Sequence, residues 1–472
     1  MEKKFLNIAF LFLIGCSKLN NISDVNSNRE TRPNVLFITI DDMNDWTTLF
    51  NQNNPIRTPN LKKLAKKSFF FSNAYSSSPA CNPSRVSVMT GTRPHKTGIY
   101  GNLSNWRKAL NGVKTIQSHF KENGYLVFGS GKIFHHHNDW SFHDNGSFDE
   151  YLMMSINEPY PNEKINGLKD YGSRNTDWGP WPDNIQKTVD FKSVEYAKIK
   201  LNKKYDKPFF LNIGIYKPHS PFFVPQRFFD EYPIDEIVTP LLPNQDIDDL
   251  PSGAKKITNE KKWFWNGMIK AKEKNPNAYL EYVQAYQACS SFADEMIGKI
   301  LDALESSDYA KNTIIILWSD HGFHLGEKNH FEKFALWEKS NHIPFIIYVP
   351  NLNKSGIIIN NPVDMTTIYP TLSELCGLKI PEHAEGFSLV PLLKGNSIKT
   401  NPALTTYMRG NHTVRSERWR YIKYSDGSEE LYDHFIDPNE WNNLASKKEN
   451  TEIINYLKKF IPKVDSDQVP DL

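Results

Sequence analysis

The chain has 472 residues, of which 39% are hydrophobic and 13% aromatic, and this much apolar surface excludes intrinsic disorder for most of it. The 56 Lys and Arg residues nearly balance the 54 Asp and Glu residues, so the net charge of +2 argues against a dedicated nucleic-acid-binding protein. Four cysteines are too few for a disulfide scaffold at this length.

The N-terminus has the features of a bacterial secretion signal. Lys3 and Lys4 precede an apolar run over 5–14, which is too short to span a bilayer but has the length of a signal-peptide core. The run ends in Leu-Ile-Gly-Cys16, which resembles a lipobox, in which the cysteine becomes the lipidated first residue. An ordinary cleaved signal with an incidental cysteine is the alternative. We predict a lipoprotein signal peptide over 1–16 with lipidation at Cys16, a polar tether over 17–32, and lipid anchoring in the periplasm or at the surface of a bacterium.

Short apolar runs alternate with amphipathic stretches after residue 33, which predicts an α/β fold. Runs apolar enough for strands covered on both faces of a sheet occur at 35–40, 125–128, 209–213, 314–318 and 345–349. Apolar residues at three- and four-residue spacing predict a helix over 278–306, and weaker patterns predict helices over 61–71 and 366–375. The stretches 155–190 and 225–275 lack periodicity and are predicted to be long loops that decorate a site.

The sequence changes in character after about residue 400. Residues 413–424 and 430–434, separated by Asp-Gly, predict a hairpin, and 452–460 predict a closing helix. We therefore predict a catalytic domain over 33–400 and a small α+β subdomain with an antiparallel sheet over 401–472.

Two acidic pairs follow predicted buried strands. Asp41 and Asp42 come directly after 35–40, and Asp320 and His321 follow 314–318 after a single serine, Ser319. Open α/β sheets place their sites at the carboxyl ends of parallel strands, and adjacent carboxylates repel each other unless a cation or a proton holds them. A metal site at this sheet edge is one interpretation, and a solvated acidic pair that caps a helix is the other.

The most specific motif is Cys81-Asn-Pro-Ser-Arg85, followed after four residues by Thr-Gly. A lone cysteine in a secreted chain usually packs or pairs, but this string resembles the sulfatase signature, in which the cysteine is oxidised to Cα-formylglycine. From about Asn34 to Leu444 the chain resembles a type I sulfatase of the alkaline-phosphatase superfamily, in the iduronate-2-sulfatase-like branch. The resemblance implies a large mixed sheet sandwiched by helices, with a smaller C-terminal α+β subdomain.

The resemblance also implies the cofactors of the site. One divalent cation would be held by Asp41, Asp42, Cys81 as formylglycine, Asp320 and His321. Calcium fits because most of these ligands are hard oxygens, and magnesium is the alternative. A formylglycine-generating maturation enzyme would have to act on Cys81, and Arg85 would neutralise the formylglycine oxyanion.

The remaining catalytic roles are implied position by position. Lys132 and Lys333 match the two sulfate-binding lysines, with Lys328 as the nearest competitor of Lys333. His135 matches the histidine that helps to eliminate sulfate, although His136 and His137 follow it directly. His219 matches the residue that contacts the substrate and protonates the leaving alcohol, a role suited to a group that titrates near neutrality.

These residues predict a sulfatase that acts on a sulfated, uronic-acid-containing polysaccharide or its oligosaccharides, either an ulvan-like algal polymer or a glycosaminoglycan. A phosphatase or phosphodiesterase of the same superfamily and a catalytically dead carbohydrate-binding lipoprotein are the two alternatives. A sugar-facing wall is one interpretation of the loops 95–110 and 160–190, and core packing of their tryptophans is the other. The residues concerned are His95, Trp106, Arg107, Trp178 and Trp181.

Overall fold

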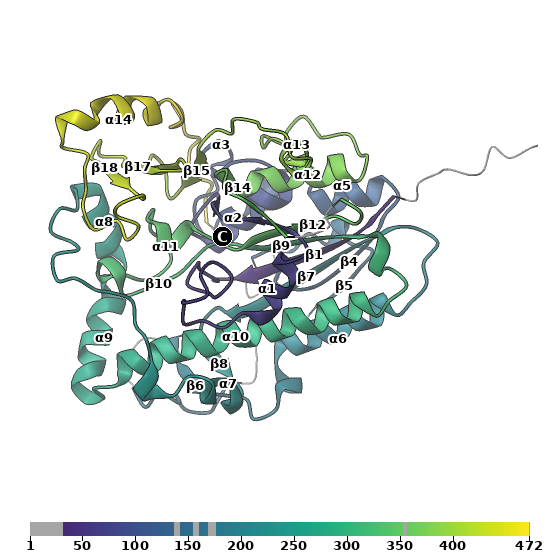
Figure 1. Cartoon of the computed structure of the whole chain (residues 1–472), viewed down its shortest axis with the longest axis horizontal. Coiled ribbons are helices and arrows are strands. Elements are labelled where there is room, and N and C mark those ends of the chain that lie inside the picture. The colour runs from purple at the N-terminus through teal and green to yellow at the C-terminus, as the bar shows by residue number, and fades with distance from the viewer. Residues whose placement is uncertain (1–31, 136–141, 154–159, 169–175, 353–355, 472) are drawn as a thin grey trace, which may run out of the picture. The chain divides into compact units, whose positions relative to one another are not determined.

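The structure, a computed structural model, describes residues 32–471 except 136–141, 154–159, 169–175 and 353–355 (Figure 1). The predicted signal peptide, Cys16 and nearly all of the predicted tether therefore lie outside the described residues. Residues Pro33–Leu472 form one compact unit. Within the described part of the chain, no helix combines the length and the apolar character needed to cross a membrane.

A sheet of eight strands forms the centre of this unit. Its strand order is β13-β2-β12-β9-β1-β7-β4-β5, and every neighbouring pair is parallel except the two pairs that β12 makes. All five predicted strands belong to it. The bounds are β1 (Asn34–Asp41), β2 (Phe69–Phe71), β4 (Leu126–Gly131), β5 (Glu150–Leu152), β7 (Phe209–Pro218), β9 (Thr313–Ser319), β12 (Phe345–Tyr348) and β13 (Ile357–Ile359).

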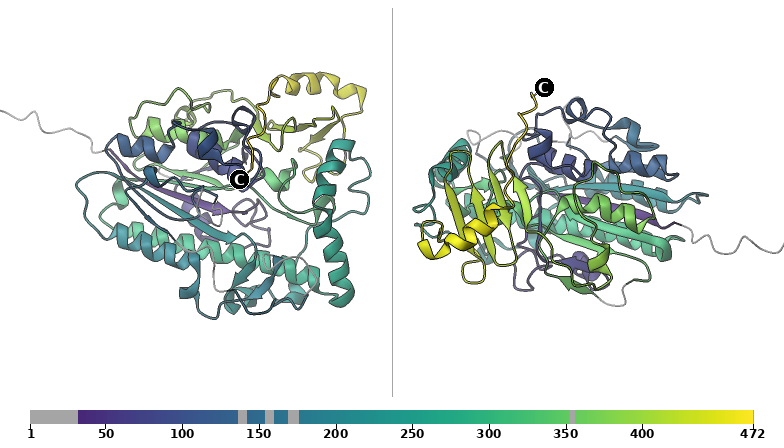
Figure 2. Two further views of the ribbon diagram at one scale, coloured as in Figure 1. Left: turned by 180° about the vertical axis from the view of Figure 1, so that it is seen from behind. Right: turned by 90° about the horizontal axis from the view of Figure 1, so that it is seen from above.

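Helices cover both faces of this sheet (Figures 1 and 2). In β1, Leu36 and Ile38 belong to one buried apolar cluster, and Val35 and Phe37 belong to another, as the two-residue period of a strand requires. The first cluster includes α1 (Pro59–Ala65), α6 (Val189–Leu201) and α10 (Ala278–Glu305), and the second includes α2 (Cys81–Thr90), α5 (Ile116–Glu122) and α12 (Ile368–Leu375). The predicted sandwich of a mixed sheet between helices is confirmed.

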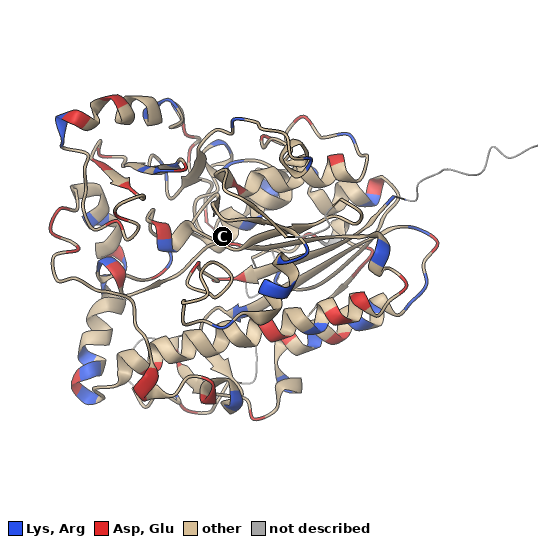
Figure 3. Ribbon diagram, in the orientation of Figure 1, with Lys and Arg blue, Asp and Glu red and all other residues tan. Residues whose placement is uncertain are grey.

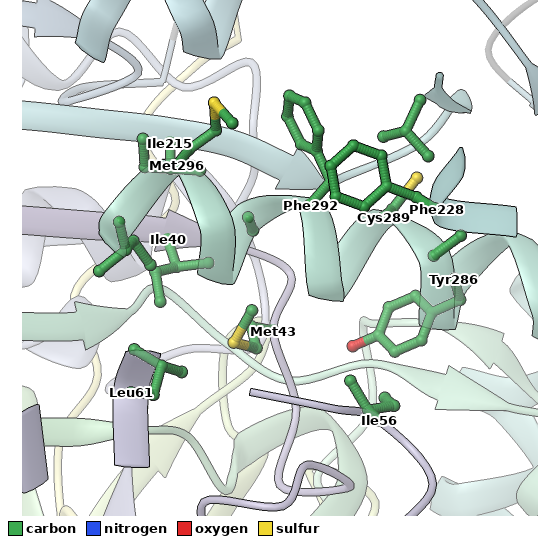
Figure 4. Close-up of a cluster of buried hydrophobic side chains, with 14 of the residues drawn as sticks. Ile40, Met43, Ile56, Leu61, Ile215, Phe228, Tyr286, Cys289, Phe292 and Met296 are labelled. Atoms are coloured by element: carbon green, nitrogen blue, oxygen red, sulfur yellow. The ribbon is translucent and has the colours of Figure 1, made fainter. Parts of the chain in front are cut away.

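The long helix α10 is the predicted helix 278–306, and its apolar side chains are buried as expected. Figure 4 shows Tyr286, Phe292 and Met296 of this helix in the same cluster as Ile40 of β1 and Ile215 of β7. Both α10 and α6 carry Lys, Asp and Glu interspersed along their length (Figure 3), in keeping with the near-neutral net charge.

Two predicted segments differ from the structure. The predicted helix 61–71 ends at Ala65, because Phe69–Phe71 form strand β2, which pairs with β12 and β13. The predicted loop 225–275 contains three helices, α7 (Gln226–Asp230), α8 (Ser252–Glu260) and α9 (Lys262–Lys274). In α9 the buried residues Phe264, Met268 and Ala271 do have helical spacing, but the exposed Trp263 and Ile269 obscure it.

A second, antiparallel sheet follows after residue 400, as predicted. Its order is β15-β16-β17-β18, which is two strands more than the predicted hairpin, because the segment 413–424 contains two strands and β15 adds another. The bounds are β15 (Ala403–Thr406), β16 (His412–Arg415), β17 (Trp419–Lys423) and β18 (Glu429–Asp433), with helix α14 (Thr451–Lys458) after them. Shorter elements are β3 (Ala74–Tyr75), α3 (Pro94–Thr97), α4 (Trp106–Ala109), β6 (Trp178–Pro180), β8 (Phe222–Val224), β10 (His324–Leu325), β11 (Phe331–Glu332), α11 (Glu338–Asn341), β14 (Val363–Asp364) and α13 (Val390–Leu393).

Candidate active site

Two acidic pairs meet at one edge of the main sheet, because β1 and β9 are parallel neighbours that end together. The backbone N–H of Asp320 donates to the Ile40 carbonyl over 3.1 Å, and the N–H of Asp42 donates to the Asp320 carboxylate over 3.1 Å. Asp42 has a φ of 68°, a left-handed conformation that Asp tolerates better than most residues. The Tyr286 hydroxyl donates to the Asp42 carbonyl over 2.8 Å and so holds this turn from α10.

Four of the five predicted metal ligands lie together. One candidate ligand atom from each of Asp41, Asp42, Cys81 and His321 lies within 4.8 Å of the others, and all four residues are buried. His321 Nε2 is 3.2 Å from Cys81 Sγ. The fifth, Asp320, lies beside this group, but its carboxylate accepts hydrogen bonds from Arg85 and from the backbone of Asp42 and His321.

The cysteine motif forms the first turns of α2. The helix begins at Cys81, the first residue of the motif. Pro83 is tolerated there because the first turn of a helix has no backbone acceptor for its N–H groups. The Ser84 hydroxyl donates to the Asp320 carbonyl over 2.5 Å, which ties the start of α2 to the end of β9.

Arg85 joins the acidic pairs to each other. Its Nε donates to Asp320 over 2.8 Å and its Nη2 donates to Asp41 over 3.1 Å, while Nη1 donates to the Ile133 carbonyl over 3.1 Å. The guanidinium is fully buried, so these ion pairs are shielded from solvent. Arg85 therefore fixes the positions of both carboxylates beside Cys81.

Two lysines approach the same carboxylates from other elements. Lys132, directly after β4, pairs with Asp41. Lys333, directly after β11, lies 2.7 Å from Asp42 Oδ1 and 3.3 Å from Cys81 Sγ. Burial alone would raise the pKa of the Cys81 thiol, but Lys132, Lys333 and His321 outweigh it and hold that pKa well below its ordinary value. The site therefore favours a negative charge at the position of Cys81.

The two predicted catalytic histidines differ in their contacts. His135 interacts with the Cys81 thiol, and burial is the main cause that lowers the pKa of His135 to about 4. His219, after β7, is only partly buried, and its Nδ1 donates to the Ser220 carbonyl over 2.5 Å, which leaves Nε2 to exchange a proton. His136 and His137, the alternatives to His135, lie outside the described residues.

The predicted competitor Lys328 is not at this site. Its ammonium lies 2.8 Å from Asp246 Oδ1, and its backbone N–H donates to the other oxygen of that carboxylate over 2.9 Å. Lys333 is therefore the lysine of this segment that contacts the cysteine.

The structure contradicts the sugar-facing wall at two of its tryptophans. Trp106 is fully buried, donates to the Phe142 carbonyl over 2.8 Å and stacks on Phe134. Trp178 is likewise buried in the core. Arg107 pairs with Asp144, so its charge is already neutralised. Core packing, the alternative, holds for both tryptophans because their rings fill space between elements that only the fold brings together.

Two tyrosines of the site were not found from the sequence. The Tyr216 ring contacts both Lys132 and His219: the Lys132 ammonium is 5.2 Å from its centre, and the His219 ring centre is also 5.2 Å away. Tyr286, which holds the Asp42 turn, was counted only as an apolar residue of its helix. No local pattern marks either role, since both depend on contacts between distant segments.

The donor set fits a divalent cation. Two buried aspartates supply hard oxygens, which suit Ca²⁺ or Mg²⁺, while a thiolate beside an imidazole suits softer ions such as Zn²⁺. Replacing the Cys81 sulfur by an oxygen would therefore harden the whole set. Three carboxylates of the site face three fixed cations, Arg85, Lys132 and Lys333, so a further divalent cation would give the site a net attraction for anions.

Comparison with known proteins agrees with this geometry. Residues 33–378 match the sulfatase family, and residues 326–467 match the C-terminal family of N-sulphoglucosamine sulphohydrolase. A sulfatase from Formosa agariphila is 39% identical over 457 residues, which cover 92% of this chain and 87% of that protein. Iduronate 2-sulfatase from Homo sapiens is 28% identical and the match covers 94% of this chain and 86% of that protein.

A solved structure shares the fold. It is that of a protein in complex with its substrate D-glucosamine-2-N,6-O-disulfate, which superposes with a TM-score of 0.73 at 22% identity and covers 91% of this chain and 96% of that one. The match over 33–378 includes every candidate catalytic residue described above, from Asp41 to Lys333. The chain accordingly belongs to the sulfatase family and is a sulfuric ester hydrolase.

Proposed function

We propose that the enzyme removes sulfate esters from a sulfated, uronic-acid-containing polysaccharide or its oligosaccharides, with Cys81 as formylglycine. The observation that carries this proposal is the placement of Cys81 Sγ, 3.3 Å from Lys333 Nζ and 3.2 Å from His321 Nε2 at the start of α2. These groups favour an anion at that position, which is where an attacking oxygen would form.

The formylglycine hydrate would supply one hydroxyl for attack on sulfur and a second hydroxyl whose deprotonation releases sulfate and re-forms the aldehyde. Arg85 holds the carboxylates that flank this position. His135, which is neutral over most of the pH range because its pKa is about 4, accepts a proton from the residue at position 81.

The surrounding cations and His219 complete the chemistry. Lys132 and Lys333 bind sulfate oxygens and stabilise the charge that develops on them. His219 donates the proton of Nε2 to the departing sugar oxygen, while its Nδ1 stays bonded to the Ser220 carbonyl. An alkyl alcohol is a poor leaving group, so this proton is needed in the transition state.

Calcium, with magnesium as the alternative, is the proposed cation. Asp41, Asp42, His321 and the formylglycine oxygen would hold it, with Asp320 alongside. It would supply Lewis-acid stabilisation of the sulfate oxygens. Removal of the ion by a chelator should abolish activity, and Ca²⁺ or Mg²⁺ should restore it; two zinc ions per chain, measured by elemental analysis, would favour a phosphatase instead.

The substrate class is supported by two comparisons. The human relative is an iduronate 2-sulfatase, and the structural neighbour was solved with a sulfated glucosamine. A lipid anchor at Cys16 would place the enzyme at a bacterial membrane, in the periplasm or at the cell surface, where extracellular glycans arrive. A formylglycine-generating enzyme would be needed in the same cell.

One assay tests the function. Sulfate and phosphate release are measured over ulvan oligosaccharides, heparan and dermatan sulfate oligosaccharides, and phosphate mono- and diesters. We expect sulfate release from one sulfated glycan class and little phosphate release. Turnover of phosphate esters alone, or binding of the glycans without any release, would overturn the proposal in favour of a phosphatase or a carbohydrate-binding lipoprotein.

A further inference from the structure

The ring of Phe334 lies close to two lysine ammonium groups at the edge of the candidate active site. Lys333 Nζ is 5.9 Å from the ring centre, and Lys261 Nζ is 4.2 Å from it. The two ammonium groups therefore lie no farther apart than the sum of these distances. Lys261 thus adds a second positive charge close to the lysine that is proposed to bind sulfate.

Lys261 is held there by packing between α9 and β11. It lies at the junction of α8 and α9. At the start of α9, the rings of Phe264 and Trp265 lie 5.2 Å and 5.6 Å from the ring of Phe331 in β11, the strand that leads into Lys333. The position of Lys261 relative to Lys333 is therefore fixed by buried aromatic contacts rather than by a free loop.

The charge of Lys261 differs from that of the two buried lysines in making no short ion pair. Lys132 pairs with Asp41 and Lys333 pairs with Asp42, whereas no carboxylate of the described residues comes within 4.0 Å of Lys261 Nζ. The side chain is half-buried, so a ligand can reach it. The acid that faces it is Glu332, and burial raises the pKa of that carboxyl.

The backbone around Lys333 is also unusual. Glu332 has a φ of 67° and Phe334 has a φ of 72°, although neither is a glycine. Non-glycine residues in this region cost conformational energy and cluster at binding and catalytic sites. Here the two turns place Lys333 toward Cys81 and the Phe334 ring against Lys261.

We propose that Lys261 is a specificity-determining residue that binds a second anionic group of the substrate, a carboxylate or another sulfate ester, while Lys333 binds the sulfate to be removed. This inference rests on the proposed function. Contact with an aromatic ring holds an ammonium less strongly than a charge-assisted hydrogen bond, so an anion in reach would take it from Phe334. The ring then remains as an apolar surface for the sugar face.

The test compares three disaccharides that carry the same sulfate ester. The first has a uronic acid, the second is its carboxyl-reduced counterpart, and the third is the reduced form with a second sulfate. We expect Lys261→Ala to raise the KM by about 10-fold for the disaccharide whose second anion, the carboxylate or the second sulfate, binds Lys261. The kcat for that disaccharide should change little. The KM for the reduced disaccharide should not change, and Lys261→Arg should restore most of the affinity.

Lys262→Ala is the matched control, since it removes the same charge one residue along, from an exposed position. It should leave all three KM values near those of the parent enzyme, and thermal unfolding should confirm that both variants are folded. An effect confined to the uronic acid or to the second sulfate identifies the anion. An equal KM change for all three disaccharides, or no change, would overturn the inference, whereas absence of sulfate release from any substrate by the parent enzyme would overturn the proposed function instead.

Discussion

Two buried clusters of charge in this molecule have the same acidic and imidazole composition but different partners. The first contains Asp41, Asp42 and His321, and the second contains Glu338, Glu440 and His434. In both, candidate ligand atoms lie within 4.8 Å of one another. By proximity alone, either cluster is a candidate metal site.

The cations separate the two clusters. In the second, Arg420 lies 2.5 Å from Glu440 and also pairs with Glu338, and Arg415 adds a contact of 3.2 Å to Glu338. Arginine keeps its proton and holds carboxylates in a fixed geometry. The carboxylates of Glu338 and Glu440 are therefore held in permanent ion pairs. In the first cluster Arg85 likewise holds Asp41, but two lysines and the Cys81 thiol also surround the acids, and these groups can exchange protons or ligands.

The second cluster therefore has a structural role. Glu338 begins α11, Arg415 ends β16 and Arg420 lies in β17, so the ion pairs tie the C-terminal sheet to the segment that follows Lys333. The comparison shows that a group of carboxylates is recognised as a site by the cations and nucleophiles around it, rather than by the distances between acids.

The largest expected effect comes from removing the nucleophile of the first cluster. Cys81→Ala should lower turnover of sulfate esters by at least about 10⁴-fold, because loss of a nucleophile leaves only binding and electrostatic stabilisation. Cys289→Ala, which removes a buried thiol from the core of α10, is the matched control and should keep its activity per folded molecule.

Peptide mass spectrometry with hydrazide labelling should also find an aldehyde at position 81 in protein made together with a maturation enzyme. An active enzyme that carries only the unmodified thiol would contradict the proposed chemistry.

The next largest effect distinguishes the proton-donor role of His219 from the sulfate-binding role of the two lysines. His219→Ala should slow hydrolysis of a sugar sulfate by about 10²- to 10⁴-fold, the usual contribution of general acid catalysis. It should slow an activated aryl sulfate far less, since a nitrophenolate leaves without a proton. Lys132→Ala or Lys333→Ala should harm both substrates alike because the sulfuryl group is common to them. Equal losses for His219→Ala on the two substrates would assign the acid to another residue.

Breaking the second cluster should change stability and leave chemistry intact. Arg420→Met leaves Glu338 and Glu440 buried without their main cation, which should lower the free energy of unfolding by about 3–5 kcal/mol. Arg418→Ala breaks a pair with Asp433 whose arginine is exposed to solvent, so its cost should be far smaller than that of Arg420→Met. Urea unfolding measures both. A loss of activity per folded Arg420→Met molecule would show that the second cluster also serves the chemistry.

Much of this fold was predictable because its sheet consists of short runs of apolar residues. The Phe69–Phe71 strand was not, since its aromatic residues continue a helical pattern and only pairing with β12 and β13 makes it a strand. The positions of the acids were predictable because they follow buried strands of one sheet, and the role of Cys81 was predictable from its sequence motif. The hydrogen bond from Arg85 to Asp320 was not, because the Arg85 side chain reaches across from α2.

The smallest expected effect concerns Asp45, which connects the two clusters. It lies three residues after Asp42, and Lys339 and His342, in and after α11, approach its carboxylate to 2.9 Å and 3.1 Å. Burial alone would raise the pKa of Asp45, but Lys339 and His342 outweigh it and lower that pKa from 3.8 to about 2.

Because the folded pKa of Asp45 is below the unfolded one, its contribution is fully present above pH 3.8 and is lost as the pH falls toward 2. At neutral pH it amounts to about 2.5 kcal/mol, the free-energy equivalent of that difference in pKa. Asp45→Asn should therefore lower the free energy of unfolding by roughly this amount at pH 6, and the difference from the parent enzyme should narrow between pH 4 and pH 3. Asp302→Asn, at an exposed pair with Lys63, should give no such pH-dependent difference. A difference for Asp45→Asn that stays constant with pH would mean that packing rather than charge stabilises this connection between the two clusters.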